Sequence, residues 1–171
     1  MIRLLLTIVL ALAVTACGFH LRNTLSLPAE IGPVRVIAPD PYSAIAESLA
    51  QALERAGATP AAADAQTGVS TLQVVSERWA TTPLALDQFG RAQEFTLRYA
   101  VVFTLRRGDG AVLVPQQVIE LSRDYVAPPT DSIGQASESE LLARELRREM
   151  TASVLRRIDA VSRAPGAAAA P

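Results

Sequence analysis

The clearest pattern in the chain is an alternation over residues 94–106, in which every second residue is apolar and the residues between them are mostly polar. The apolar members share one side of a pleated strand: Phe95, Leu97, Tyr99, Val101, Phe103 and Leu105. The other side carries Arg98 and Arg106, so we expect it to meet water or an anionic partner. This pattern predicts a long strand in an antiparallel sheet that is covered on one face only.

Three further runs complete the predicted sheet. Residues 33–38 and 70–78 are typical of strands, and the turn sequence at 107–110 leads into a return strand at 112–125. Pro115 lacks an amide hydrogen and therefore indicates a bulge or an edge position. The first strand reaches the second through a helix and should run parallel to it, whereas the others run antiparallel. The place of the first strand in the sheet stays open.

Two amphipathic segments predict helices that cover the apolar face. The first has Asp40 as its expected cap, Gly57 at its end and this stripe: Ile45, Leu49, Ala52, Leu53 and Ala56. The second opens with Ser137 and Glu140, which match a capping box, and has this stripe: Leu142, Leu146, Met150, Val154, Ile158 and Val161. The predicted fold class is therefore α+β: a single-domain sandwich with a four-stranded, mostly antiparallel sheet and both helices packed on one face.

Two leucines of the second helix fall outside its apolar stripe. Leu141 and Leu155 are expected on the opposite side, about four turns apart at 3.6 residues per turn. Scattered surface leucines are common and explain this pattern. The alternative is a strip that contacts a partner, which makes both leucines candidate partner contacts.

The first residues have the features of an export signal. Arg3 precedes an apolar stretch of 11 residues, 4–14, whereas a helix that crosses a bilayer needs about 20. Cys17 follows a small residue and has an aliphatic residue three places before it, which resembles the bacterial lipobox. In such signals the bond before the cysteine is cleaved and the thiol is diacylated. Residues 1–16 are therefore a predicted signal peptide, and Cys17 a predicted lipidated N-terminus.

Lipidation is favoured over an ordinary buried cysteine because Cys17 is the only cysteine, so no intramolecular disulfide can form. Two or more acyl chains give a stable membrane anchor. Gly18, rather than an aspartate, follows the cysteine and implies delivery to the outer membrane. We expect a lipidated extended leader over 17–33, the folded domain over 34–162 and a disordered tail over 163–171.

Composition narrows the function further. The 171 residues suit one domain, and 16 basic against 17 acidic residues give a net charge of −1, which disfavours nucleic acid as a partner. His20 is the only histidine, so a zinc site is unsupported. No nucleophile elbow, phosphate-binding glycine loop or metalloprotease motif occurs, and nothing pairs the carboxylates. We expect no enzyme, no catalytic residue, no metal and no cofactor besides the covalent lipid on Cys17.

Three segments of the chain are distinctive: CGFHLR at 17–22, FGRAQEF at 89–95 and SRDY at 122–125, together with a last helix that opens with acidic residues. In these features the chain resembles the lipopolysaccharide-assembly lipoprotein LptE (RlpB-like) family. The resemblance implies an outer-membrane lipoprotein on the periplasmic side that plugs the lumen of the large β-barrel LptD. It further implies that the chain assists assembly of lipopolysaccharide at the outer leaflet and binds this glycolipid.

The resemblance also suggests where lipopolysaccharide binds. Antiparallel geometry should bring the loops 79–93 and 126–136 together at one end of the sheet. Arginine pairs with phosphates and carboxylates through a planar fork, so the binding candidates are Arg78, Arg91 and Arg123, unless these are solvated loop arginines. The basic positions of the family fall on Gln88 and Gln135 here. The cation is therefore relocated, to Arg91, or the contact with the glycolipid is weaker.

Three alternatives to this interpretation remain. The chain could be an accessory lipoprotein of another outer-membrane barrel, an adaptor to the cell wall, or a lipoprotein enzyme. The enzyme is disfavoured by the missing nucleophile and ligand sets, whereas the other two differ only in the partner.

Overall fold

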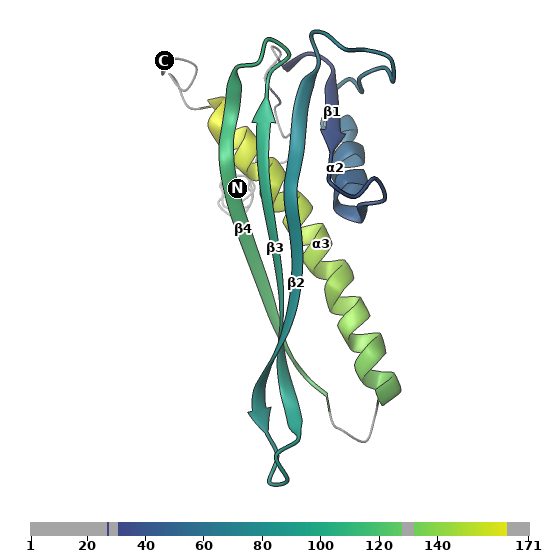
Figure 1. The fold of residues 1–171 in the computed structure, drawn as a ribbon, viewed down its shortest axis with the longest axis vertical. Coiled ribbons are helices and arrows are strands. Elements are labelled where there is room, and N and C mark those ends of the chain that lie inside the picture. The colour runs from purple at the N-terminus through teal and green to yellow at the C-terminus, as the bar shows by residue number, and fades with distance from the viewer. Residues whose placement is uncertain (1–26, 28–30, 128–131, 164–171) are drawn as a thin grey trace, which may run out of the picture.

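The fold is a sheet covered on one face by two helices (Figure 1). The structure, a computed structural model, describes residues 27, 31–127 and 132–163. Its elements are β1 (Val34–Ile37), α2 (Ala44–Arg55), β2 (Ser70–Leu86), β3 (Ala92–Arg106), β4 (Val112–Val126) and α3 (Ser132–Arg163). The strands lie in the order β1-β2-β3-β4, with β1 parallel to β2 and the other neighbours antiparallel. The predicted fold class is confirmed, and β1 takes one edge of the sheet.

The core lies between the helices and the face of β3 that the alternation predicted. Tyr99, Val101 and Phe103 are fully buried there. The stripe of α3 is confirmed as well, because Leu146 and Met150 are buried against the same cluster. A slip of one residue in β3 would move its whole apolar set to the open face, so burial fixes the register.

Residues before β1 also take part in this core. Ile31 is buried, and Leu27 packs against the same cluster. The Ser70 hydroxyl, which is itself buried, donates a hydrogen bond to the Ile31 carbonyl. The last residues of the predicted leader therefore pack with the domain.

The two helices begin elsewhere than their sequences suggested. Ser43, not Asp40, caps α2 and accepts a hydrogen bond from the Ala46 amide at 3.3 Å. The Asp40 carboxylate instead accepts from the Tyr42 amide at 2.9 Å, which uses it in the preceding turn. In α3 the helix starts five residues before the predicted cap, so Ser137 lies inside it. Helix ends are hard to place from the sequence for this reason: a neighbouring side chain can take over the cap, as in α2, or the helix can extend upstream, as in α3.

The β2–β3 hairpin is longer than predicted and projects beyond both helices (Figure 1). β2 runs on past Arg78 to Leu86, which pairs with Ala92 of β3, so the predicted loop 79–93 is mostly strand. Its residues are exposed, so they carry little of the alternation that marks a half-buried strand. At the opposite end, Gly68 and Gly108 come so close that a Cβ on Gly108 would lie 2.3 Å from the Gly68 carbonyl carbon.

β4 forms the second edge of the sheet, as Pro115 indicated. Its register against β3 shifts between the positions opposite Phe103 and Leu105, close to the proline. Pro115 therefore removes no donor from an interior ladder.

Candidate functional site

The tip of the β2–β3 hairpin is a tight turn organised by one carboxylate. Asp87 accepts hydrogen bonds from the amides of Phe89 at 2.8 Å and Arg91 at 2.9 Å, and its second oxygen accepts from Arg91 Nε at 2.8 Å. The Arg91 amide and guanidinium together hold the pKa of Asp87 below its usual value. The Arg91 guanidinium also lies 5.2 Å from the centre of the Phe89 ring. Arg91 is thus at the sheet end, as predicted, and already paired.

The three arginines predicted to bind lipopolysaccharide do not come together. Arg78 pairs with Ala100 well inside the sheet, so the prediction that it lies near the hairpin end is wrong. Arg123 lies opposite Leu97 on the helix-covered face, where it forms an ion pair with Glu149 of α3 at 2.5 Å. Strand alternation puts Arg78 on the other, open face. Pairing across the sheet, which no single strand encodes, decides these positions.

Other predicted site residues have different outcomes. Gln88 is exposed in the hairpin turn, whereas Cys17 and the side chain of Gln135 lie outside what the structure describes. Leu141 is 47% exposed, which is compatible with a contact surface. Leu155, by contrast, packs against the core and faces α2, so the two leucines do not share an exposed strip.

A polar cluster inside the covered face was not foreseen. Glu77 accepts hydrogen bonds from the Tyr99 hydroxyl at 2.9 Å and from the Ser43 hydroxyl at 3.2 Å. Trp79 stacks on Tyr99 with ring centres 3.8 Å apart. Burial, and then the bond to Glu77, raise the pKa of Tyr99, so its hydroxyl remains a donor. The cluster joins β2, β3 and the start of α2.

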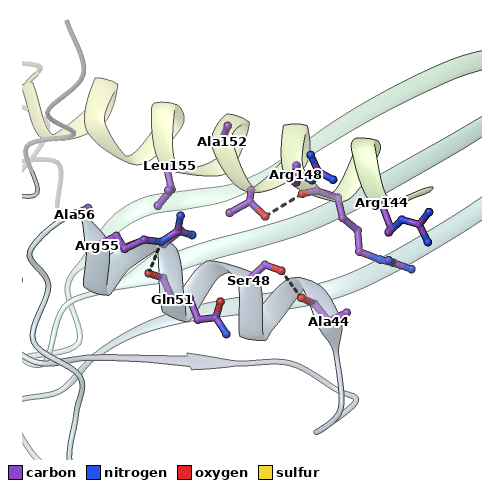
Figure 2. Close-up of a pocket in the computed structure, with 12 residues that line it drawn as sticks. Ala44, Ser48, Gln51, Arg55, Ala56, Arg144, Arg148, Ala152 and Leu155 are labelled. Atoms are coloured by element: carbon purple, nitrogen blue, oxygen red, sulfur yellow. Dashed lines mark hydrogen bonds between the residues drawn. The ribbon is translucent and has the colours of Figure 1, made fainter. Parts of the chain in front are cut away.

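Beside this cluster, α2 and α3 enclose a groove of about 820 Å³. Its lining consists of Ala44, Ser48, Gln51, Ala52, Arg55, Ala56, Arg144, Arg147, Arg148, Thr151, Ala152 and Leu155. Figure 2 shows Arg144 near one end of the groove, and Arg55 with Leu155 near the other. Sequence reasoning missed this site, although arginines at 144, 147 and 148 share one helical face and thus gave a signal.

The charge in this groove is of one sign, because four arginines and no carboxylate line it. Arg144 forms an exposed ion pair with Glu140 at 2.6 Å, and Arg55 donates to the Gln51 carbonyl at 3.2 Å. Arg147 lies with its guanidinium 5.4 Å from the centre of the Trp79 ring. Its buried Nε has no hydrogen-bond partner, which is costly for a charged donor. The groove therefore favours a negatively charged ligand that accepts hydrogen bonds.

In residues 27, 31–127 and 132–163, no three histidine, cysteine or acidic side chains cluster closely enough to hold a metal ion. None of the helices in this part of the chain has a stretch of sufficient length and hydrophobicity to span a membrane.

These features define a small α+β domain that offers surfaces for binding: a projecting hairpin and a basic groove between helices. Residues 31–158 match the family model described as LptE, Lipopolysaccharide-assembly. The chain therefore belongs to the LptE family of outer-membrane-associated, non-enzymatic lipopolysaccharide-assembly lipoproteins. That this chain itself catalyses nothing stays a prediction.

Two relatives and two solved structures illustrate the similarity. The LPS-assembly lipoprotein LptE of Photorhabdus laumondii is 28% identical over 157 residues, which are 90% of this chain and 85% of that protein. Its namesake from Pectobacterium atrosepticum is 25% identical over 162 residues, with 90% and 84% covered.

The solution structure of an uncharacterized lipoprotein B from Nitrosomonas europaea has a TM-score of 0.70 at 26% identity and covers 86% of this chain and 94% of that one. The crystal structure of rare lipoprotein B from Shewanella oneidensis has a TM-score of 0.65 and covers 75% of this chain and 95% of that one. At 22% identity the latter shows the fold alone.

Proposed function

We propose that the chain is the plug of an LptD-type outer-membrane barrel and assists assembly of lipopolysaccharide at the outer leaflet. A lipid on Cys17 would anchor it to the periplasmic side of the outer membrane, with the domain inside the barrel lumen. The observation that carries this proposal is the family match over residues 31–158.

The shape of the domain supports a plug. The hairpin projects beyond the helices, and its apolar side chains Leu84, Leu86 and Phe89 are 59%, 64% and 72% exposed. Clustered apolar side chains at a surface mark a contact site, because exposure to water costs free energy that a partner relieves. The tip and Leu141 are therefore the surfaces that we assign to the barrel.

The test is isolation of the native membrane complex and identification of its other subunit. The full chain with an affinity tag should recover one large β-barrel in stoichiometric amount. Leu86→Ser with Phe89→Ser should reduce that recovery, whereas Tyr42→Ser, which removes an exposed ring beside the start of α2 and away from the hairpin tip, should not. Recovery of cell-wall fragments instead, or of the free chain alone, would overturn the plug.

The anchor has its own test. Cys17→Ser removes the thiol that would carry the acyl chains, so the variant should leave the membrane fraction. An unaltered membrane fraction would eliminate lipidation as the mechanism of anchoring.

We further propose that the chain binds lipopolysaccharide directly through the three predicted arginines, of which Arg91 lies at the hairpin tip and the other two lie farther back in the sheet. Arg91 is half exposed at the tip, and the exposed guanidinium of Arg78 makes no hydrogen bond or ion pair with any residue that the structure describes. Arg123 is engaged by Glu149 and is the weakest of the three. The expected order of importance is therefore Arg91 and Arg78 before Arg123.

Replacing all three by glutamine should lower the amount of lipopolysaccharide that co-purifies with the full chain in detergent. The single variants should rank as above, at up to about tenfold each, since charge-assisted bonds are the strong ones. Arg106→Gln is a matched control, because Arg106 is exposed at the opposite end of β3. Equal binding by the triple variant and the wild type would refute direct recognition by these residues.

A further inference from the structure

The groove between α2 and α3 has an electrostatic character that the plug does not use. Each helix contributes one stripe, and the only charged side chains in the lining are arginines: Arg55, Arg144, Arg147 and Arg148. Like charges that face one another across a groove repel, by an amount that grows as water is excluded. An anion in the groove would turn this repulsion into attraction.

The uncharged polar side chains of the groove already use hydrogen-bond donors within their own helices. Ser48 and Thr151 donate their hydroxyl hydrogens to backbone carbonyls of their own helices, at 2.7 and 2.9 Å. The side-chain amide of Gln51 donates a hydrogen bond to the Glu47 carboxylate at 3.2 Å. The charged donors of the lining are guanidinium N–H groups, which include the buried Arg147 Nε without a partner. The Arg148 guanidinium makes no hydrogen bond or ion pair within the part of the chain that is described.

The dimensions of the groove decide between a small ligand and a peptide. About 820 Å³ falls in the range of small-molecule sites, roughly 300–1,000 Å³. Ala56, Ala152 and Leu155 supply an apolar wall toward one end, while Arg144 and Arg148 lie toward the other (Figure 2). A ligand with an anionic head and a carbon body fits this gradient.

We propose that this groove binds a phosphate-bearing small molecule, with its phosphate held by Arg144, Arg147 and Arg148. A phosphate presents three or more acceptor oxygens and no obligatory donor, and guanidinium forks match it in pairs. A single carboxylate has only two oxygens for three guanidinium groups. The phosphate can belong to free inorganic phosphate or to the headgroup of a phosphorylated amphiphile, whose body would lie on the apolar wall.

This site is separate from the surface proposed above for lipopolysaccharide. It shares no residue with Arg78, Arg91 and Arg123, so replacement of those three leaves the groove intact. Either proposal can fail without the other.

Titration calorimetry on the full chain in non-ionic detergent tests the groove, with inorganic phosphate and dihexanoyl phosphatidic acid as the two probes. The chain has one tryptophan, Trp79, and the Arg147 guanidinium lies over its ring, so its fluorescence gives a local second readout. Saturable binding of either probe, with a change in Trp79 emission, is expected. Tighter binding of the phosphatidic acid identifies the headgroup of an amphiphile as the source; equal binding identifies free phosphate.

The decisive variant replaces the exposed arginines Arg144 and Arg148 by glutamine together. Loss of two charge-assisted contacts should raise the Kd at least about tenfold while the circular dichroism stays unchanged. Arg156→Gln with Arg157→Gln makes the same change of charge on the same helix but outside the groove, and it should bind as the wild type does. No saturable binding at millimolar probe, or equal weakening in both double variants, would overturn the proposal.

Discussion

The two ends of the sheet are made of the same strands, yet they differ in what covers them. Near the β3–β4 turn, the side chains of Leu72, Phe103 and Val114 are fully or almost fully buried under the helices. Near the β2–β3 turn, Leu84, Leu86 and Phe89 are more than half exposed. The strand ladder alone continues to the tip, without a second layer.

The covered end therefore stabilises the fold, whereas the projecting end is available for contact with another surface. Burial of apolar area stabilises by about 25 cal/mol per Å², so the covered end supplies most of the folding free energy. The projecting end gains little from its apolar side chains until another surface covers them. A domain of this kind can expose an apolar hairpin because the buried core at the opposite end stabilises the fold.

The largest expected contrast comes from removing one phenylalanine at each end. Phe103→Ala leaves a cavity in the core and should lower the free energy of unfolding by about 3–5 kcal/mol. Phe89→Ala should change it by no more than about 0.5 kcal/mol, because the ring is 72% exposed. Urea unfolding followed by circular dichroism measures both. Comparable losses would mean that the hairpin end is covered within the chain itself.

Replacing one glycine by alanine at the β3–β4 turn and one at the β2–β3 turn should give a smaller difference in stability. Gly108→Ala would place its Cβ against the backbone of Gly68, so the loop must shift, at a cost of about 1–3 kcal/mol. At the tip, Gly90→Ala meets nothing within 4 Å and is strained only by a φ of 76°, for about 1–2 kcal/mol. Thermal unfolding of the two variants ranks them. A Gly108→Ala protein as stable as the wild type would show that the two loops separate easily.

The smallest effect concerns pH at the β3–β4 turn. The Arg107 guanidinium and the Ala111 amide lower the pKa of Asp109 from 3.8 to about 2. A lowered pKa stabilises the fold above the unfolded value, and this contribution is lost as the pH falls from about 4 toward 2. Asp109→Asn should flatten the pH dependence of Tm in that window slightly. An NMR titration that places the midpoint of Asp109 near 4 would contradict the prediction.

Periodicity allowed much of the fold to be predicted. The alternation around Tyr99 identifies the apolar face of β3, and the stripe through Leu146 and Met150 identifies that of α3. Both faces are buried only if the helix packs on that side of the sheet. Cap signals were less informative at Asp40 and Ser137, because neighbouring side chains and upstream helical turns compete for the same amides. The prediction that the three arginines lie together was wrong for a similar reason, because cross-strand pairing sets Arg78 and Arg123 on opposite faces.

The sequence by itself determined the class of the fold, the buried faces of β3 and of both helices, and the family, because these depend on short-range patterns and on matched segments. Only the tertiary structure decided how far the hairpin projects and which arginines share a groove. Those features depend on the register between strands and on how α2 docks beside α3. The groove brings together residues about 90 positions apart in the chain, such as Arg55 of α2 and Arg144 of α3, and no local pattern specifies that arrangement.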